Sequence, residues 1–93
     1  MPSIISATQS ASTQTFTVTG NFWLMGDYFG PSEFAVLERQ NNAANGYEPV
    51  TNSKGVVCVS AFPNTVFVEV PAGTYRIRKQ ATAIAASVNY TQA

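Results

Sequence analysis

Apolar and polar residues alternate along two stretches of the chain, which is typical of β-strands that bury one face. Between Thr15 and Met25, side chains of one parity are aromatic or aliphatic, and those of the other parity are mostly Thr and Asn. Gly20 interrupts this alternation, and an isolated glycine in a strand indicates a β-bulge. The second stretch runs from Val66 to Lys79 and carries alternating valines, a turn and alternating arginines.

Weaker patterns predict the remaining elements. Residues 34–40 form a short apolar run that fits a strand or a helical turn, and residues 46–51 form a strand that Pro49 restricts to a sheet edge. Residues 55–62 are rich in β-branched side chains and predict a buried strand. Roughly six or seven short strands with turn signals every ~8–12 residues predict one all-β domain over residues 1–93, an antiparallel β-sandwich that is immunoglobulin-like or jelly-roll-like.

The stretch 66–79 has three interpretations. A hairpin with a three-residue loop at 71–73 places valines on the same face as Arg76 and Arg78, which would desolvate two guanidinium groups. A four-residue loop places Glu69 opposite Arg76 and keeps the arginines outside. In the third interpretation the two strands belong to different sheets, and the spacing Pro-Ala-Gly-Thr-Tyr resembles the tyrosine corner of immunoglobulin-like and fibronectin-like sandwiches, with Tyr75 closing the turn.

The two ends of the chain are polar and low in charge. Residues 1–13 contain one apolar pair, Ile4 and Ile5, and we expect an extended N-terminal arm there. Residues 80–93 alternate weakly and fit either a final strand or a second arm. Extended segments can add a strand to a neighbour's sheet through backbone hydrogen bonds, so the arms are candidates for contact with other subunits.

Composition narrows the possible partners. Charged residues make up 11% of the chain with a net charge of zero, against about 25% in typical domains. Thr, Ser, Asn and Gln supply 30 of the 93 residues instead, which favours a surface that other subunits cover. The few basic residues argue against a nucleic-acid partner. The sequence has no apolar run of 18 residues, so it predicts no membrane span. The N-terminal residues do not have the pattern of a secretion signal.

The chain offers little catalytic chemistry. It contains no histidine, so the usual general base near neutral pH is missing. Its only cysteine, Cys58, lies in an apolar strand, which favours an inert core thiol. Clustered Cys or His ligands for zinc are missing, and the carboxylates are too scattered to suggest a calcium loop. We therefore expect no enzymatic activity, no metal and no cofactor.

Aromatic and basic residues are the candidate binding groups. Trp23 belongs to the core if a bulge at Gly20 reverses its parity, and to the polar face if it does not. On the polar face, Trp23 would join Tyr28 and Phe29 in an aromatic patch, and such patches mark partner surfaces. Arg76 and Arg78, with Lys79 at the strand end, are either a solvated edge or a docking site for an acidic partner subunit.

In overall type the chain resembles the small β-sandwich decoration or cement proteins of tailed bacteriophage capsids. The features that carry the resemblance are the start MPSIIS, the abundance of Thr, Ser, Asn and Gln, the lack of His, the single Cys and the turn PAGTY. The resemblance implies a non-catalytic homo-oligomer, often a trimer, which binds and stabilises the shell. Its partners would be the major capsid protein or other virion subunits, and its location would be the virion.

Two other functions remain open. One is a small carbohydrate- or receptor-binding module of a phage tail, fibre or adhesin, in which Trp23, Asp27 and Tyr28 face a glycan. The other is an interaction domain of a larger cellular assembly.

Overall fold

The computed structural model describes residues 2–41 and 46–93, and within these ranges the protein is all-β and antiparallel. None of the described residues forms a helix that could cross a membrane. The strands are β1 (Ser3–Thr8), β2 (Ser12–Val18), β3 (Phe22–Asp27), β4 (Phe34–Asn41), β5 (Gly46–Pro49), β6 (Thr51–Asn52), β7 (Gly55–Val56), β8 (Cys58–Ser60), β9 (Thr65–Val68), β10 (Gly73–Lys79) and β11 (Ala86–Gln92).

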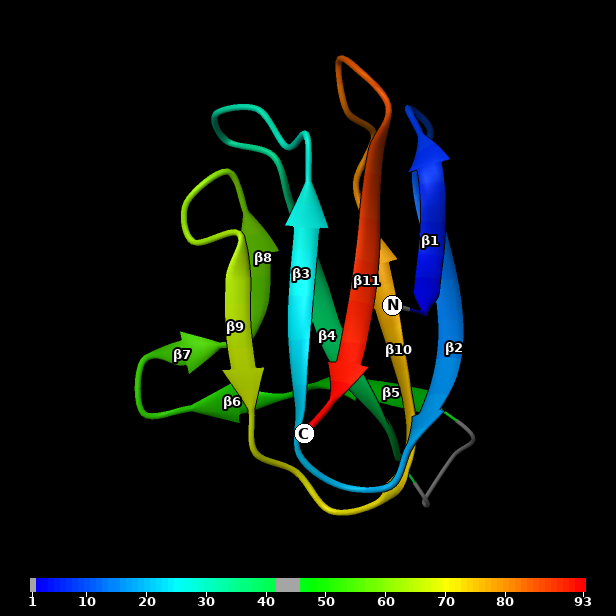
Figure 1. Ribbon diagram of the computed structural model, residues 1–93, viewed down its shortest axis with the longest axis vertical. Helices are drawn as coiled ribbons and strands as arrows, with labels where there is room; N and C mark the ends of the chain where they lie inside the picture. The colour runs from blue at the N-terminus through cyan, green and yellow to red at the C-terminus, as the bar shows by residue number, and fades with distance from the viewer. Residues whose placement is uncertain (1, 42–45) are drawn as a thin grey trace.

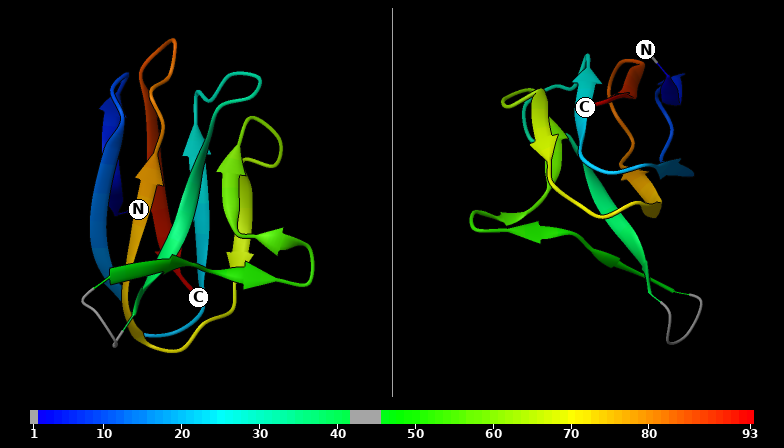
Figure 2. Two further views of the ribbon diagram at one scale, coloured as in Figure 1. Left: turned by 180° about the vertical axis from the view of Figure 1, so that it is seen from behind. Right: turned by 60° about the horizontal axis from the view of Figure 1, so that its bottom comes forward.

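Two sheets face each other in a β-sandwich-like arrangement (Figures 1 and 2). One sheet has the strand order β1-β11-β3-β9. The other has the order β2-β10-β4-β5, and β8 also pairs with β4. Strands β6 and β7 form a separate hairpin that projects from the side of the molecule (Figure 2). The chain crosses from one sheet to the other after each of β1, β2 and β3, so most strand neighbours are distant in sequence.

The core lies between the two sheets and follows the alternation that the sequence shows. Phe22 and Leu24 of β3 meet Leu37 of β4 and Ile77 of β10, and all four side chains are fully buried. Since successive side chains of a strand point to opposite faces, each strand contributes every second residue to this layer. Four aromatic rings pack together within it, with centroid separations between 5.0 and 6.4 Å: Phe16, Phe22, Tyr75 and Tyr90.

The strand expected over Thr15–Met25 is two strands in different sheets. β2 ends at Val18 and β3 begins at Phe22, with Gly20 at φ 154° in the connection. That backbone conformation favours glycine, so Gly20 allows a crossing between sheets and not the expected bulge within a strand. The parity of the apolar residues survives because both strands turn them toward the same core.

The strand expected over residues 55–62 is also divided. Val57 separates β7 from β8 and is buried. Its amide donates to the Val50 carbonyl at 2.8 Å, and its carbonyl accepts a hydrogen bond from the Leu37 amide at 3.0 Å. Residues 51–56 therefore leave the large sheet as the projecting hairpin, while Pro49 lies in the outermost strand β5 of that sheet.

Of the arm expected over residues 1–13, the described residues 2–13 do not extend from the domain. β1 pairs with β11, and β2 pairs with β10, so the two ends of the chain lie together in the fold (Figure 1). Ile5 is buried in the core and Ile4 packs against it. The C-terminal residues 86–92 form strand β11, which corresponds to the strand alternative for that end. Both segments bury apolar side chains in their own core.

The stretch 66–79 forms a corner between the sheets, so neither hairpin register exists. β9 belongs to the four-stranded sheet and β10 to the five-stranded sheet. The Tyr75 hydroxyl donates to the Pro71 carbonyl at 2.8 Å and closes the turn. Arg76 pairs with Glu38 of β4 across the sheet, in place of the Glu69 partner of the four-residue hairpin.

Candidate functional site

The aromatic patch expected from Trp23, Tyr28 and Phe29 does not form. Trp23 lies near the start of β3 and is 44% exposed, so its core alternative is wrong. Tyr28 follows the end of β3, about 16 Å away at ~3.3 Å per strand residue. Phe29 is buried, and its ring packs over Gly26.

Trp23 instead pairs with Phe67 on the outer face of the four-stranded sheet. The two residues are opposite each other in β3 and β9, with ring centroids 4.8 Å apart. Both side chains remain partly exposed. Cross-strand aromatic pairs stabilise a sheet by a few tenths to about 1 kcal/mol, and an exposed pair also offers a flat apolar surface.

Three apolar side chains stand on loops at one end of the sandwich, where the loops 9–11, 28–33, 61–64 and 80–85 gather (Figure 1). We call this region the loop end. Tyr28 is 71% exposed, Phe62 is 94% exposed and Ile84 is 58% exposed. Phe62 and Ile84 were not among the expected binding residues. No periodicity marks a loop residue, and only the strand topology brings these loops to one end.

The backbone at Tyr28 is unusual for an aromatic residue. Tyr28 has φ 69°, in the left-handed region that non-glycine residues seldom adopt. Such conformations cost about 1–3 kcal/mol and persist where the surrounding structure enforces them, which is common at functional sites. Here the conformation allows Phe29 to enter the core while Tyr28 faces solvent.

Glu33 holds two loops of the loop end together. Its carboxylate accepts hydrogen bonds from the Gly30 amide at 2.6 Å and from the Ala83 amide at 2.8 Å. These two bonds, first that of Gly30 and then that of Ala83, lower the pKa of Glu33, and the nearby charge of Lys79 acts in the same direction. The ionised carboxylate is therefore the form that fits the loop end.

Lys79 connects the loops 9–11 and 80–85 of the loop end through hydrogen bonds of its ammonium group. Its parity within β10 is that of Tyr75 and Ile77, so it lies inside the domain and not beside Arg78 as expected. Its ammonium group donates to the Ser10 carbonyl at 3.0 Å, the Gln80 carbonyl at 3.0 Å and the Thr82 hydroxyl at 3.1 Å. Burial lowers the pKa of Lys79, and the charge of Glu33 partly opposes that effect.

The loop that carries Phe62 is fixed by backbone hydrogen bonds. The Ser60 amide donates to the Pro63 carbonyl at 3.0 Å, and the Gly26 amide donates to the Asn64 carbonyl at 2.8 Å. Internal hydrogen bonds therefore hold all three loops that carry Tyr28, Phe62 and Ile84, so these exposed side chains stand on ordered backbone. Preorganisation of this kind reduces the entropy lost when a partner binds.

The two arginines proposed as docking residues are bound within the chain. Arg76 contacts Glu38 with its Nε at 2.6 Å from Oε1, and Arg78 contacts the same carboxylate with Nη2 at 3.3 Å from Oε2. The guanidinium of Arg76 also lies 4.2 Å from the centre of the Tyr47 ring. Arg76 therefore has mainly a structural role, while Arg78 is more than half exposed and retains donors for a partner.

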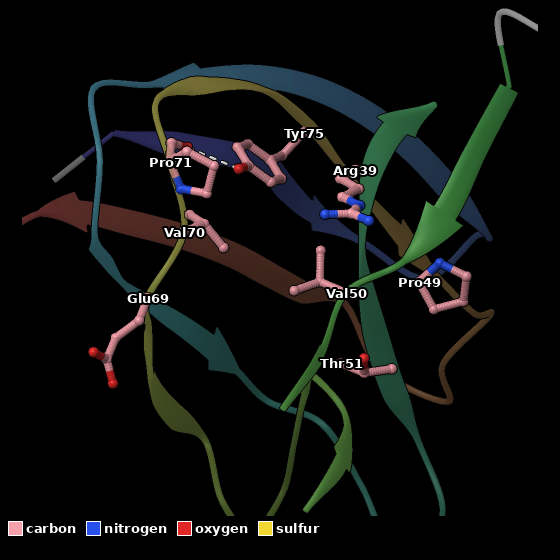
Figure 3. Close-up of a pocket in the computed structure, with 8 residues that line it drawn as sticks. All are labelled: Arg39, Pro49, Val50, Thr51, Glu69, Val70, Pro71 and Tyr75. Carbon is pink, nitrogen blue, oxygen red and sulfur yellow. Dashed lines mark hydrogen bonds between the residues drawn. The ribbon is translucent and has the colours of Figure 1, made fainter. Parts of the chain in front are cut away.

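A small cavity of about 180 Å³ lies at the opposite end, beside the tyrosine corner (Figure 3). Arg39 extends toward its interior, whereas Glu69 points away from it. Arg39 is bound to Glu48 at 2.9 Å, and the Tyr75 hydroxyl is occupied by Pro71. The polar groups of this cavity thus serve the fold, and nothing in their arrangement selects a ligand.

Within the described ranges no three His, Cys, Asp or Glu side chains come close enough together to hold a metal ion. Cys58 is half-buried and lies beside β9 at the side of the sandwich. Asp27 is exposed and accepts a hydrogen bond from the Asn89 amide group at 3.1 Å. Comparison with protein-family models, with curated proteins and with solved structures found no match to this chain.

Proposed function

We propose that the protein is a non-catalytic structural component of a virion, a decoration or cement protein that binds and stabilises a phage shell through its loop end. The observation that carries the proposal is the display of Tyr28, Phe62 and Ile84 on neighbouring loops of one end. Full burial of one such side chain is worth about 1.5–3 kcal/mol. Aromatic residues in this setting are typical anchors of protein interfaces.

The order of the strands in the two sheets supports this proposal, because it corresponds to a fold that viral capsid domains use. Without β5, β6 and β7, the remaining strands form two sheets with the orders β1-β11-β3-β9 and β2-β10-β4-β8. We assign this order to a jelly roll, a fold of two Greek keys that occurs in viral capsid and lectin domains. An immunoglobulin-like sandwich would instead place several consecutive strands side by side, although the corner at Tyr75 is common to such folds. This support is an analogy of fold, because one fold serves many functions.

Binding to undecorated shells of the phage that encodes the chain tests the proposal. We expect the purified protein to sediment with such shells, and we expect Phe62→Ser to weaken the binding roughly tenfold or more, as loss of one buried anchor would. Thr17→Ser is the control, because Thr17 is exposed on the edge strand β2 and lies outside the loop end. Failure of the unaltered protein to bind, or equal losses in the two variants, would contradict the proposal.

The exposed pair of Trp23 and Phe67 supports a second candidate, a carbohydrate-binding module, because flat aromatic faces can stack on sugar rings. Under that function, the protein would bind members of a glycan panel, and Trp23→Ala would abolish the binding without unfolding the domain. A protein that binds no glycan on the panel would exclude this candidate.

A further inference from the structure

The four-stranded sheet ends at β9, and the separate hairpin β6–β7 projects beyond that edge (Figure 2, right). The space left between β9 and the hairpin is a groove of about 580 Å³. Its lining includes Lys54, Val56, Cys58, Pro63, Val66 and Phe67. The position next to β9 is therefore open to one more strand.

The outer edge of β9 is free to accept such a strand. Within the described residues β9 pairs only with β3. An edge strand usually carries Lys, Pro or a bulge that prevents pairing with another chain. The sequence of β9, Thr-Val-Phe-Val, contains no lysine or proline, and its pairing with β3 is regular over all four residues. By contrast, β1 at the other edge of the same sheet has two register shifts, which disrupt an edge for further pairing.

We propose that β9 of a second copy of this chain pairs antiparallel with β9 and joins the two four-stranded sheets across a two-fold axis. The outward row of this segment is Thr65, Phe67 and Glu69. A register centred on Phe67 places the two Phe67 rings opposite each other and places Thr65 opposite Glu69 of the second copy. The hydroxyl of Thr65 can donate to that carboxylate, so every position has a compatible partner.

The same register continues the aromatic pair across the axis. Trp23 and Phe67 of one copy would be followed by Phe67 and Trp23 of the other, in one row on the outer face of an eight-stranded sheet. The partly exposed area of both residues would thereby be covered. The net charge of the chain is zero, so two copies do not repel each other overall.

The projecting hairpin explains how a short strand can support a dimer. Four residues of β9 offer little area by themselves, and stable interfaces bury about 1,200 Å² or more in total. Each hairpin would extend beneath β9 of the other copy, so that Val56 and the groove add apolar contact to the backbone pairing. In a symmetric dimer this contribution occurs twice.

Antiparallel pairing also points the two loop ends in opposite directions. On a shell, one loop end of such a dimer would bind shell protein and the other would point away from it; this consequence rests on the proposed function. The pairing of β9 itself involves different residues from the loop end. Variants of the two surfaces can therefore fail independently.

Multi-angle light scattering and sedimentation equilibrium of the purified chain over micromolar to millimolar concentrations test the dimer. We expect a mass that rises from 10.0 kDa toward twice that value. Thr65→Lys and Phe67→Lys each place a positive charge on the edge strand β9, which opposes pairing with a second chain. We expect each variant to raise the dimer dissociation constant at least tenfold. Thr17→Lys is the matched control on the free edge strand β2, and Phe62→Lys is the control at the loop end; both should leave the dimer unchanged.

Cys58 gives an independent readout because it is the only cysteine and lies in the groove. Its rate of reaction with a thiol reagent should fall as the concentration of the unaltered protein rises, and should stay constant in Phe67→Lys. A monomer at every concentration overturns the proposal. A dimer that Thr17→Lys disrupts while Phe67→Lys leaves it intact overturns it equally. Loss of shell binding in Phe62→Lys with the dimer intact bears on the proposed function alone.

Discussion

Replacement of Tyr75 by phenylalanine isolates the hydrogen bond that closes the corner between the sheets. The Tyr75 hydroxyl donates to the Pro71 carbonyl at 2.8 Å, and the residue is 3% exposed. The ring, which packs against Phe16 and Phe22, remains in the variant. The change therefore removes one hydrogen bond while the apolar core contacts stay.

The expected loss follows from the burial of Tyr75 and the exposure of its acceptor residue, Pro71. A typical intramolecular hydrogen bond contributes about 0.5–1.5 kcal/mol net, and a buried acceptor left without a donor adds about 1–3 kcal/mol of desolvation cost. Because Pro71 lies at the exposed edge of the corner, water can replace part of the bond. We expect the free energy of unfolding to fall by about 1–2 kcal/mol, which for a domain of this size lowers Tm by roughly 4–15 °C.

Urea and thermal unfolding of Tyr75→Phe measure this loss, with Tyr90→Phe as the control. Tyr90 belongs to the same aromatic cluster, but its hydroxyl makes no hydrogen bond to the described residues. We expect Tyr90→Phe to change stability by less than about 0.5 kcal/mol. Equal effects of the two variants would refute the role assigned to the corner.

The pH dependence of the same variants provides a second check. Burial raises the pKa of Tyr75 above its ordinary value of 10.0, although Arg39 partly opposes this. The neutral hydroxyl thus stabilises the folded state below pH 10.0, and this contribution is lost as pH rises through the higher folded pKa. The unaltered protein should lose stability in that range, and Tyr75→Phe should lack this component of the loss.

Three further predictions concern the loop end. Gly26→Ala should destabilise the fold by about 1–3 kcal/mol, since a Cβ there would lie 2.7 Å from the Phe29 ring; unaltered stability in urea unfolding would show that Phe29 can move away. Lys79→Met leaves the Ser10 and Gln80 carbonyls without their donor, so the free energy of unfolding should fall by about 1–3 kcal/mol. Amide hydrogen exchange in residues 80–85 should become faster. Unchanged exchange there would contradict the role of Lys79 in holding these loops. Because the folded-state pKa of Glu33 is lowered, its ionised carboxylate stabilises the fold above pH 4.5, and this stabilisation is lost as pH falls through the folded pKa. Glu33→Gln should therefore flatten the decline of stability at acid pH. An identical decline in both proteins would refute this role of Glu33.

Alternation predicted the buried faces well because burial on one side of a strand is a local property of the sequence. Phe22, Leu24, Tyr75 and Ile77 are all in the core, as their parity requires. The local pattern did not show where the chain leaves one sheet for the other. At Gly20 the parity of the apolar residues continues across the crossing, so a change of sheet has the same sequence pattern as one continuous strand.

The residues of the proposed binding surface were harder to predict because their placement depends on contacts between distant segments. The loop end brings together four loops that are separated along the chain, and Phe62 and Ile84 have no periodic pattern around them. Lys79 was expected near Arg78 on the surface, yet acceptors from the 9–11 and 80–85 loops allow its ammonium group to be buried. Only the positions of those acceptors make such burial favourable.

The proposed function implies that a phage encodes this chain, and a cryo-electron microscopy map of that phage's virion tests the proposal most directly. The proposal predicts copies of the protein on the capsid surface, with the loops 28–33, 61–64 and 80–85 in contact with shell subunits. Virions that lack the protein, or copies attached with no loop end in contact with the shell, would contradict it.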